Sequence, residues 1–240
     1  MCGRKLFVVN VGANASHGNA VSPLYDDGNF DLITIPEQRG VLSRECLRYS
    51  DLRWHFRGAV RLILGERKWT TVTHNDPDLW NGVYGDLPHS SPRAAALRRA
   101  RPGDYLLFFA RLRAFHAKGF RGKAGFYFIG GWRIERILDI RENTQFPKSK
   151  GVPENPHVRK HLKGSRQRFS LFLAGTKPVR LAPPIRMDRP LLERILPESR
   201  MWNWTSGRSP LQTMGSYLRT VRAIDTRTHR GLTDLLRVGG

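Results

Sequence analysis

Five runs of aromatic and β-branched residues, bounded by Gly or Pro, dominate the hydrophobic pattern of the chain. Such runs are typical of strands. They cover Lys5–Val11, Phe30–Ile35, Tyr105–Phe115, Gly125–Ile140 and Phe169–Ala174. The pattern predicts a core made mainly of strands.

Helix signals are shorter. Ser91 as N-cap, Pro92 at the first position and the stop signal Pro102-Gly103 predict a helix over residues 92–100. Further helices are expected at Asn155–Lys163, Arg189–Ile195 and Leu211–Thr220.

The long runs from Tyr105 and from Gly125 predict a hairpin that follows a tight Pro-Gly-Asp turn. A hairpin with helices packed at its ends suits a small mixed barrel, so the expected class is α+β and strand-dominated. With no repeat and no low-complexity linker, one composite domain over 1–240 is expected. Its core covers about 4–182, and a basic, Trp- and Arg-rich extension covers about 183–240.

The connection after the first strand, residues 12–29, is much longer than the two to five residues of an ordinary hairpin turn. Its glycines allow close approach of a ligand to the backbone, and its amides can read a base edge. The alternative is an Asx-rich turn that caps its own backbone. Candidate ligand-binding residues are Asn10, Asn14, Ser16, His17, Tyr25 and Asp27.

A second polar group lies in the segment "THNDPDLWNGVYGD", which contains His74, Asp76, Asp78, Tyr84 and Asp86. Histidine beside carboxylates can bind a metal or perform acid–base chemistry. The spacing matches no established zinc or calcium loop, and Asn-Asp-Pro is also an ordinary turn initiator. We therefore expect no metal and no cofactor. If the protein is an enzyme, the catalytic candidates are His17, His74, Asp76 and Asp86.

Charge favours a nucleic-acid partner, DNA or RNA. The 41 Lys and Arg against 20 Asp and Glu give a formal charge of +21, which phosphates would neutralise with release of counterions. A solvated basic surface is the alternative. Residues expected at the nucleic-acid backbone are Lys148, Lys150, Arg159, Lys160, Lys163, Arg166 and Arg168, with His157 as a further base-binding candidate beside them.

Several classes of protein are excluded or disfavoured. No stretch reaches the roughly 20 apolar residues of a membrane span, and no signal peptide is recognised, so a cytoplasmic protein without a membrane partner is expected. Cys2 and Cys46 form neither a zinc spacing nor a disulfide framework. There is no Walker loop, dinucleotide glycine pattern or deaminase zinc signature. The opening "MCGR" resembles abasic-site-trapping SRAP proteins and amidotransferases, but nothing after it continues either pattern.

Four segments taken together, "FVVNVGANASHG", "SPLYDDGNFDLITIPE", "HNDPD…YGD" and "GDYLLFFARL", resemble the third nucleotide modification associated domain family. The resemblance covers most of residues 5–175 and implies a context of modified nucleotides in bacteria, archaea and phages. The turn Gly103-Asp104 and the strands around it also look like the barrel of the PUA superfamily. ASCH, EVE and YTH members of that superfamily hold a flipped, modified base, so the resemblance implies a PUA-like barrel with flanking helices.

Three hypotheses follow. The first is a reader that flips a modified base into a polar pocket, with Trp80, Tyr84, Phe109 and Trp132 as candidate stacking residues. The second is an enzyme, hydrolase or transferase, that acts on modified nucleotides. The third is a basic interaction domain of a ribonucleoprotein, in which the charged surface alone provides binding.

Overall fold

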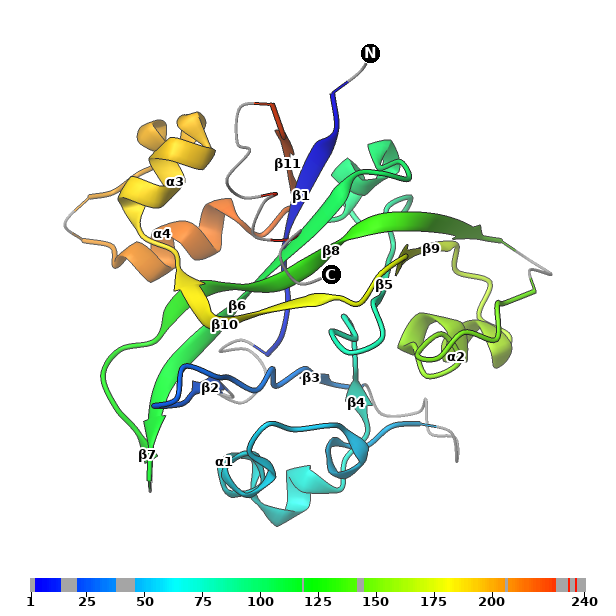
Figure 1. Ribbon diagram of the computed structural model, residues 1–240, viewed down its shortest axis with the longest axis horizontal. Coiled ribbons are helices and arrows are strands. Elements are labelled where there is room, and N and C mark those ends of the chain that lie inside the picture. The colour runs from blue at the N-terminus through cyan, green and yellow to red at the C-terminus, as the bar shows by residue number, and fades with distance from the viewer. Residues whose placement is uncertain are drawn as a thin grey trace.

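A nine-stranded mixed sheet forms the centre of the computed structural model (Figure 1). The structure describes residues 3–13, 21–37, 46–117, 119–141, 145–205, 207–227, 233 and 236. The main path of the sheet follows β11 (Arg222–Asp225), β1 (Lys5–Asn10), β6 (Tyr105–His116), β8 (Gly125–Ile140), β9 (Phe169–Ala174) and β5 (Val83–Asp86). Off this path, β10 (Val179–Arg186) pairs with β8, and β2 (Ser22–Leu24) and β7 (Gly119–Phe120) pair with β6.

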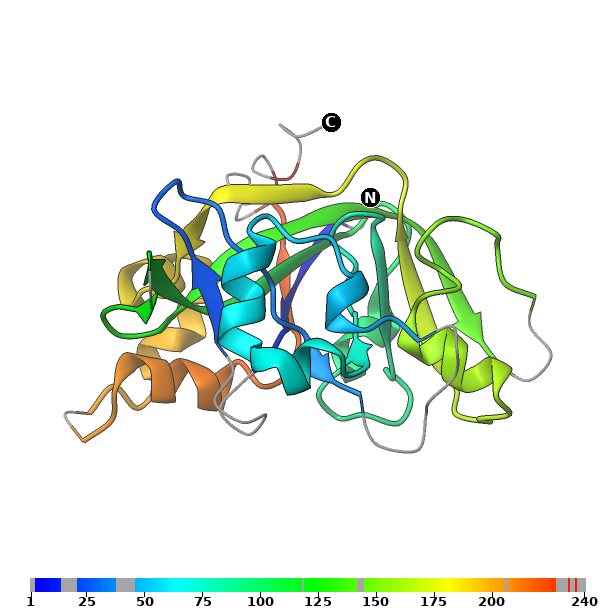
Figure 2. The same ribbon diagram turned by 90° about the horizontal axis from the view of Figure 1, so that it is seen from below.

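The helices lie around this sheet. In the described part of the chain they are α1 (Arg57–Trp69), α2 (Pro156–Leu162), α3 (Arg189–Ile195) and α4 (Pro210–Tyr217). Figures 1 and 2 show α3 and α4 together at one end of the molecule and α2 at the other. Short 3-10 helices cover Tyr49–Asp51, Ala95–Arg99 and Pro197–Met201, and a separate pair is formed by β3 (Ile35–Pro36) and β4 (Thr73–His74).

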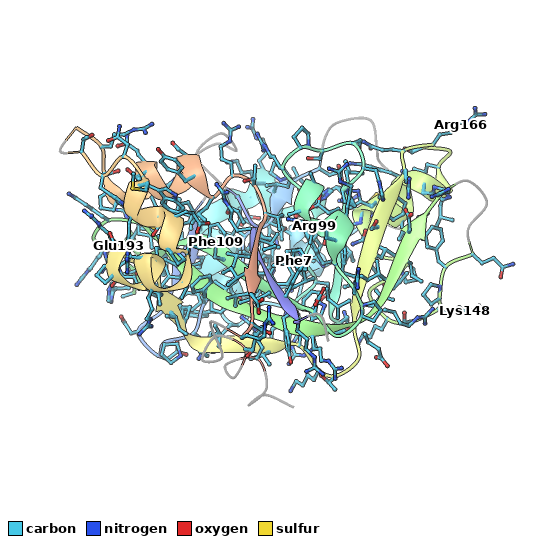
Figure 3. All side chains as sticks on the ribbon, turned by 90° about the horizontal axis from the view of Figure 1, so that it is seen from above. Phe7, Arg99, Phe109, Lys148, Arg166 and Glu193 are labelled. Carbon is cyan, nitrogen blue, oxygen red and sulfur yellow. The ribbon has the colours of Figure 1, made fainter. Side chains whose placement is uncertain are left out.

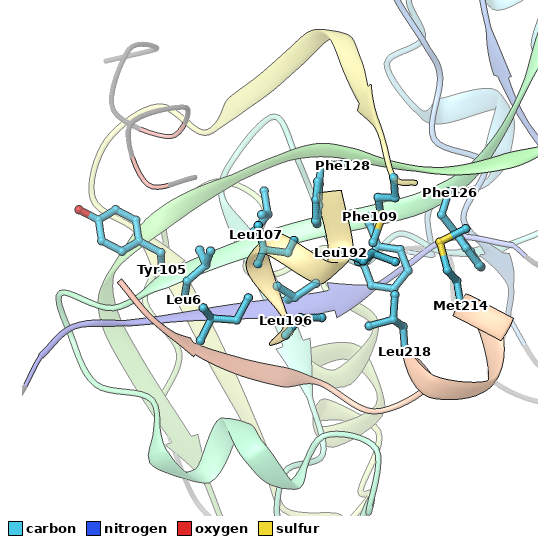
Figure 4. Close-up of a cluster of buried hydrophobic side chains, with 14 of the residues drawn as sticks. Leu6, Tyr105, Leu107, Phe109, Phe126, Phe128, Leu192, Leu196, Met214 and Leu218 are labelled. Atoms are coloured by element: carbon cyan, nitrogen blue, oxygen red, sulfur yellow. The ribbon is translucent and has the colours of Figure 1, made fainter. Parts of the chain in front are cut away.

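Strand β1 is buried on both faces of the sheet. Successive side chains of a strand point to opposite faces, and Leu6 and Val8 accordingly join one hydrophobic cluster while Phe7 and Val9 join another. Two helices cover the first cluster, as Figure 4 shows. Leu192 and Leu196 come from α3 and its C-cap, and Met214 and Leu218 come from α4 and its C-cap. The second cluster is closed by the segment that follows β4, through Leu79, Tyr84, Ala94 and Leu97.

Two adjacent glycines allow β8 to pair on both sides. A Cβ on Gly131 would lie 2.0 Å from the carbonyl oxygen of Leu106, and one on Gly130 would lie 2.2 Å from that of Val179. Gly130 also has a φ of +145°, a conformation that favours glycine. The pairing register shifts between Phe108 and Phe109 at this point, so these glycines accommodate a bulge at the centre of the sheet.

Four of the five predicted strands are confirmed: β8 and β9 have the predicted bounds, and β1 and β6 differ by one residue at their ends. The strand over Phe30–Ile35 is wrong. Phe30 forms an isolated bridge to Leu24, and only Ile35 enters a strand. The amide of Ile33 donates to the side chain of Ser22 rather than to a neighbouring strand, so the apolar run is buried without becoming a ladder.

The predicted helices in the second half of the chain are confirmed as α2, α3 and α4. The helix predicted from Ser91 is wrong as an α-helix, because the segment forms only the 3-10 turn Ala95–Arg99, held by bonds such as Leu97 N to Ala94 O.

The mixed α+β class is confirmed. No pairing joins β11 to β5 among the described residues, so a closed PUA-like barrel is not confirmed. None of the described helices could cross a membrane.

Candidate functional site

A buried polar cluster forms where three segments that are distant in the chain meet beside β5. The β3–β4 pairing sets Ile35 opposite His74 and thereby places Glu37 beside that histidine. Helix α2, which contacts β5, contributes His157 and Lys160. The loop after β4 contributes Asp76. We call Glu37, His74, Asp76, His157 and Lys160 the histidine–carboxylate cluster.

Glu37 is the residue that fixes His74. Its Oε2 lies 3.1 Å from Nδ1 of His74, and its Oε1 lies 2.8 Å from Nζ of Lys160. Burial of Glu37 by itself would raise the pKa of its carboxyl, but the hydrogen bonds and positive charges of His74 and Lys160 outweigh burial and lower that pKa to about 2. The charged carboxylate therefore holds the imidazole in one orientation.

Asp76 lies against the backbone of β5. The amide of Gly85 donates to both carboxylate oxygens at 3.0 Å, and Nε2 of His157 lies 3.6 Å from Oδ2. Burial raises the pKa of Asp76 well above its ordinary value, and the nearby Asp86 and Asp78 raise it further. A buried carboxyl with so perturbed a pKa is typical of functional sites.

Gly85 is required for this convergence. A Cβ at this position would lie 2.7 Å from Cδ2 of His157, 2.9 Å from Oδ1 of Asn155 and 3.0 Å from Oδ2 of Asp76. All three distances are shorter than, or at the limit of, real Cβ contacts. A residue without a side chain on β5 thus leaves room for the polar groups to meet.

Asn155 and Phe169 position His157. Asn155 is the N-cap of α2 and accepts the amide hydrogen of His157 at 3.0 Å. The imidazole stacks on Phe169, with ring centroids 5.7 Å apart, and meets the His74 ring edge-on at 5.2 Å. Burial, followed by the charges of His74 and Lys160, lowers the pKa of His157 to about 3, which keeps the ring neutral at physiological pH.

Asp86 extends the polar region along β5. It accepts hydrogen bonds from the Tyr84 hydroxyl and from the amide of Leu87. Burial raises the pKa of Asp86. Tyr84 itself packs in the core against Phe108 and Phe172, so its hydroxyl anchors Asp86 rather than facing an open site.

A cleft of about 420 Å³ lies next to the cluster, and Asn75 and Pro77, the neighbours of Asp76, line it. Its most distinctive feature is a set of stacked planar groups. The guanidinium carbons of Arg53 and Arg180 lie 3.9 and 4.2 Å from the ring centroid of Trp80, and Arg180 also lies over Phe30 at 4.9 Å. We call this the Arg53–Trp80–Arg180 cleft.

Two acidic residues that line the cleft are held by nearby protein donors. Asp31 accepts the Tyr25 hydroxyl at 2.8 Å and the amides of His55 and Phe56 at 2.7 and 2.9 Å. Asp78 accepts the amides of Trp80 and Asn81. These carboxylates shape the walls of the cleft by fixing its loops, while Arg53 and Arg180 present planar cationic faces.

A comparison with protein families shows to which family the chain belongs. The model of a family described as nucleotide modification associated domain 3 matches residues 5–212. The chain belongs to this family. No curated protein and no solved structure matches it. The sequence-based assignment to this family is confirmed, and membership links the chain to nucleotide modification systems.

For this member of the nucleotide modification associated domain 3 family, the structure separates the residues predicted in the opening loop. Asn10 is exposed at the end of β1, Tyr25 is buried against Asp31, and exposed Asp27 lies 2.7 Å from Nε2 of His55. None of these three lines the cleft. Asn14, Ser16, His17 and Cys2 lie outside the described residues.

The structure brings together residues that the sequence had assigned to different roles. Three catalytic candidates, His74, Asp76 and Asp86, gather with Tyr84 and His157, which had been expected to bind a base. Sequence reasoning missed Glu37, Gly85, Arg53 and Arg180. Glu37 and Gly85 carried a weak signal, because each lies near a strand end beside a predicted site; the two arginines carried none.

The residues predicted to face phosphates differ in their exposure and in their partners. Lys148, Lys150, Lys163 and Arg166 are exposed, and Figure 3 shows Lys148 and Arg166 extending from the end of the molecule opposite Glu193. Arg168 binds Asp139, and Lys160 binds Glu37. Arg159 does not fit the prediction, because it is 3% exposed: its position on α2 turns it inward.

Of the four candidate stacking residues, Trp80 lies in the cleft. Phe109 and Trp132 are wrong as base-stacking residues, because both are completely or almost completely buried in the hydrophobic clusters on either side of the sheet. Tyr84 is buried in the same cluster as Trp132. Their aromatic rings build the core that supports the cleft.

Proposed function

We propose that the protein binds a nucleotide, free or within a nucleic-acid strand, in the Arg53–Trp80–Arg180 cleft as part of a nucleotide modification system. The observation that carries this proposal is the stacking of two guanidinium groups on one indole ring. Guanidinium planes and aromatic rings are the surfaces on which proteins stack unpaired bases. The same arginines also offer charge to a phosphate.

The dimensions of the cleft suit such a ligand. Pockets for small molecules and cofactors usually measure about 300–1,000 Å³, and the cleft measures about 420 Å³. A second cavity of about 310 Å³ shares Leu79, Trp80 and Arg180 with it and adds Lys177. A base beside Trp80 would therefore have room on either side for its sugar and phosphate.

The amides along the cleft supply the means to discriminate between bases. Asn75 and Asn81 both line it, and an amide offers donors and an acceptor together, as the edge of a base requires. The cleft thus combines stacking, charge and edge recognition. This arrangement supports the recognition of a modified base, although through residues other than those of the opening loop.

A second candidate function is an enzyme that modifies or hydrolyses the bound nucleotide. The observation that favours it is the histidine–carboxylate cluster directly behind the cleft wall, where the pKa values of Asp76 and His157 are both strongly shifted by burial. Mass spectrometry of oligonucleotides recovered after incubation distinguishes the two functions. An unchanged mass with selective binding indicates a reader, and a changed mass indicates an enzyme.

Replacement of Arg53 tests nucleotide binding in the cleft. Arg53 is exposed and stacks on Trp80, so Arg53→Gln removes one planar cationic surface without opening the core. We expect R53Q to weaken binding of single-stranded oligonucleotides about tenfold, since stacking on one base contributes about 1–3 kcal/mol. Fluorescence anisotropy at several salt concentrations measures this effect.

Arg189→Gln is the matched control. Arg189 is also exposed and lies over a tryptophan, Trp204, but far from the cleft. R189Q removes the same charge from an arginine that lies over a tryptophan outside the cleft, together with its ion pair to Glu193, so its effect reports the loss of one positive charge away from the cleft. Equal, purely salt-dependent weakening by R53Q and R189Q would contradict binding in the cleft and would favour a basic interaction surface.

A further inference from the structure

We infer that His74, Asp76 and His157 bind a divalent first-row transition metal ion. One ligand atom from each of these side chains lies within 4.8 Å of the other two. Two imidazoles and one carboxylate form a ligand set that suits Zn²⁺, Fe²⁺, Co²⁺ and Mn²⁺. This inference goes beyond nucleotide binding, because the site does not require the ligand of the cleft.

The distances permit binding after small side-chain rotations. Bonds of about 2.0–2.2 Å would place two ligands of one ion at most about 4.4 Å apart, so adjustments of about 1 Å close the site. The three ligands come from β4, the loop behind it and α2. These elements are fixed by the β3–β4 pairing and by contact of α2 with β5.

The surroundings of the ligands match those of metal sites. A histidine that binds a metal usually donates its other ring N–H to a carboxylate, which fixes the tautomer and orients the ring. Glu37 lies 3.1 Å from Nδ1 of His74, which leaves Nε2 of His74 for the ion. Lys160 holds the second oxygen of Glu37 at 2.8 Å, and the amide of Gly85 holds Asp76 at 3.0 Å.

Two neighbours of the ligands, Gly85 and Asn155, support this geometry. A Cβ on Gly85 would lie 2.7 Å from Cδ2 of His157 and 3.0 Å from Oδ2 of Asp76, so the glycine allows these two ligands to approach each other. Asn155 is 2% exposed, accepts the amide hydrogen of His157 at 3.0 Å and is hydrogen-bonded through its side chain to Asp76. It therefore holds two of the three ligands in place, as the neighbours of metal ligands usually do.

Three protein ligands leave positions open for water or substrate, which is the arrangement of catalytic rather than structural metal sites. The open side and the cleft are close in sequence and in space, because Asn75 and Pro77 line the cleft on either side of Asp76. An ion at this place would act as a Lewis acid toward an oxygen of a bound ligand. The histidine–carboxylate cluster thereby gains a defined chemical role.

Titration of the metal-free full chain with Zn²⁺ and with Co²⁺ tests the inference. After treatment with chelator and dialysis, isothermal titration calorimetry and elemental mass spectrometry measure affinity and content. We expect about one ion for each chain in the unaltered protein. We expect Asp76→Asn and His157→Gln to reduce the affinity at least tenfold, and Glu37→Gln to reduce it by about 10- to 100-fold as an orienting residue.

His89→Gln is the matched control, because His89 lies near a carboxylate, with Nε2 3.7 Å from Asp139, but outside the cluster. It should leave the affinity unchanged, and circular dichroism should show that each variant is folded. If H157Q does not fold, D76N decides, since it preserves the size of the side chain. Absence of stoichiometric binding to the unaltered protein, or equal affinity in H89Q, D76N and E37Q, would overturn the inference.

Discussion

At the scale of single residues, Glu37 has the largest structural role in the histidine–carboxylate cluster. Its side chain is 3% exposed and bonds to both His74 and Lys160. A buried carboxylate is stable only when it is paired and hydrogen-bonded, and these two partners satisfy that condition. The folded structure is therefore stabilised by the ionised form of Glu37.

The pKa of Glu37 predicts how stability depends on pH. Because its pKa falls from 4.5 to about 2 on folding, its ionised form stabilises the folded state above about pH 4.5. This contribution is lost as the pH falls toward 2. Glu37→Gln should therefore lower the free energy of unfolding by about 2 kcal/mol at pH 7, with a smaller difference at pH 3. Urea unfolding in the presence of chelator measures both values.

Glu66→Gln provides the comparison for this experiment. Glu66 also pairs with a cation, Arg61, but both side chains are exposed to solvent, and exposed pairs contribute little to stability. E66Q should therefore change the free energy of unfolding much less than E37Q does, at pH 7 and at pH 3. A difference between the unaltered protein and E37Q that is the same at pH 7 and pH 3 would contradict the assigned role of Glu37.

The sequence predicted part of this cluster and could not predict the rest. His74 and Asp76 are two residues apart in the chain, so their association could be predicted from the spacing. The approach of Glu37 depends on the register of two short strands, β3 and β4, and that of His157 on contact between α2 and β5. Neither tertiary contact leaves a local pattern, so the complete cluster could not be predicted from the sequence.

At the scale of elements, α2 is the part of the fold that carries residues to the site. It is seven residues long, begins with Pro156 and is capped by Asn155, whose side chain accepts the amide hydrogen of His157. So short a helix depends on its cap and on tertiary packing. The orientation of His157 and Lys160 therefore depends on Asn155.

Replacement of this cap should affect both stability and the site. Asn155→Ala should lower the free energy of unfolding by about 1 kcal/mol and weaken metal binding, because His157 loses its fixed position. Ser209→Ala removes the corresponding cap of α4, where the side chain accepts the amide of Gln212. We expect a similar loss of stability from S209A with unchanged metal affinity. Equal metal affinity in the two variants would contradict the positioning role of Asn155.

Elements with complete local signals were predicted well, and those without were not. Strands β8 and β9 are rich in aromatic and β-branched residues between polar breaks, and α3 begins at Arg189, directly after its cap Asp188, with a proline as its second residue. The Phe30–Ile35 run has the same composition as a strand, yet Ser22 and the backbone of Ala13 take up the polar groups of Ile33. The hydrophobic pattern therefore predicted that this segment is buried, but not which groups form hydrogen bonds with its backbone.

At the scale of the whole molecule, the two ends of the sheet carry different surroundings. One face and one end are closed by α3 and α4 over the cluster of Leu6, Val8 and Phe109 (Figure 4). The other end carries α2 and the exposed Lys148 and Arg166 (Figure 3). A formal charge of +21 attracts phosphates over the whole surface, whereas the proposed function assigns recognition of the base to the cleft.

The most direct measurement of nucleotide binding is a crystal structure of the full chain with a nucleoside 5′-monophosphate. Our account predicts the base in the Arg53–Trp80–Arg180 cleft, stacked on the planar groups of its wall and within reach of Asn75 or Asn81. A nucleotide bound only at Lys148, Lys163 or Arg166, with the cleft unoccupied at saturating concentration, would contradict it.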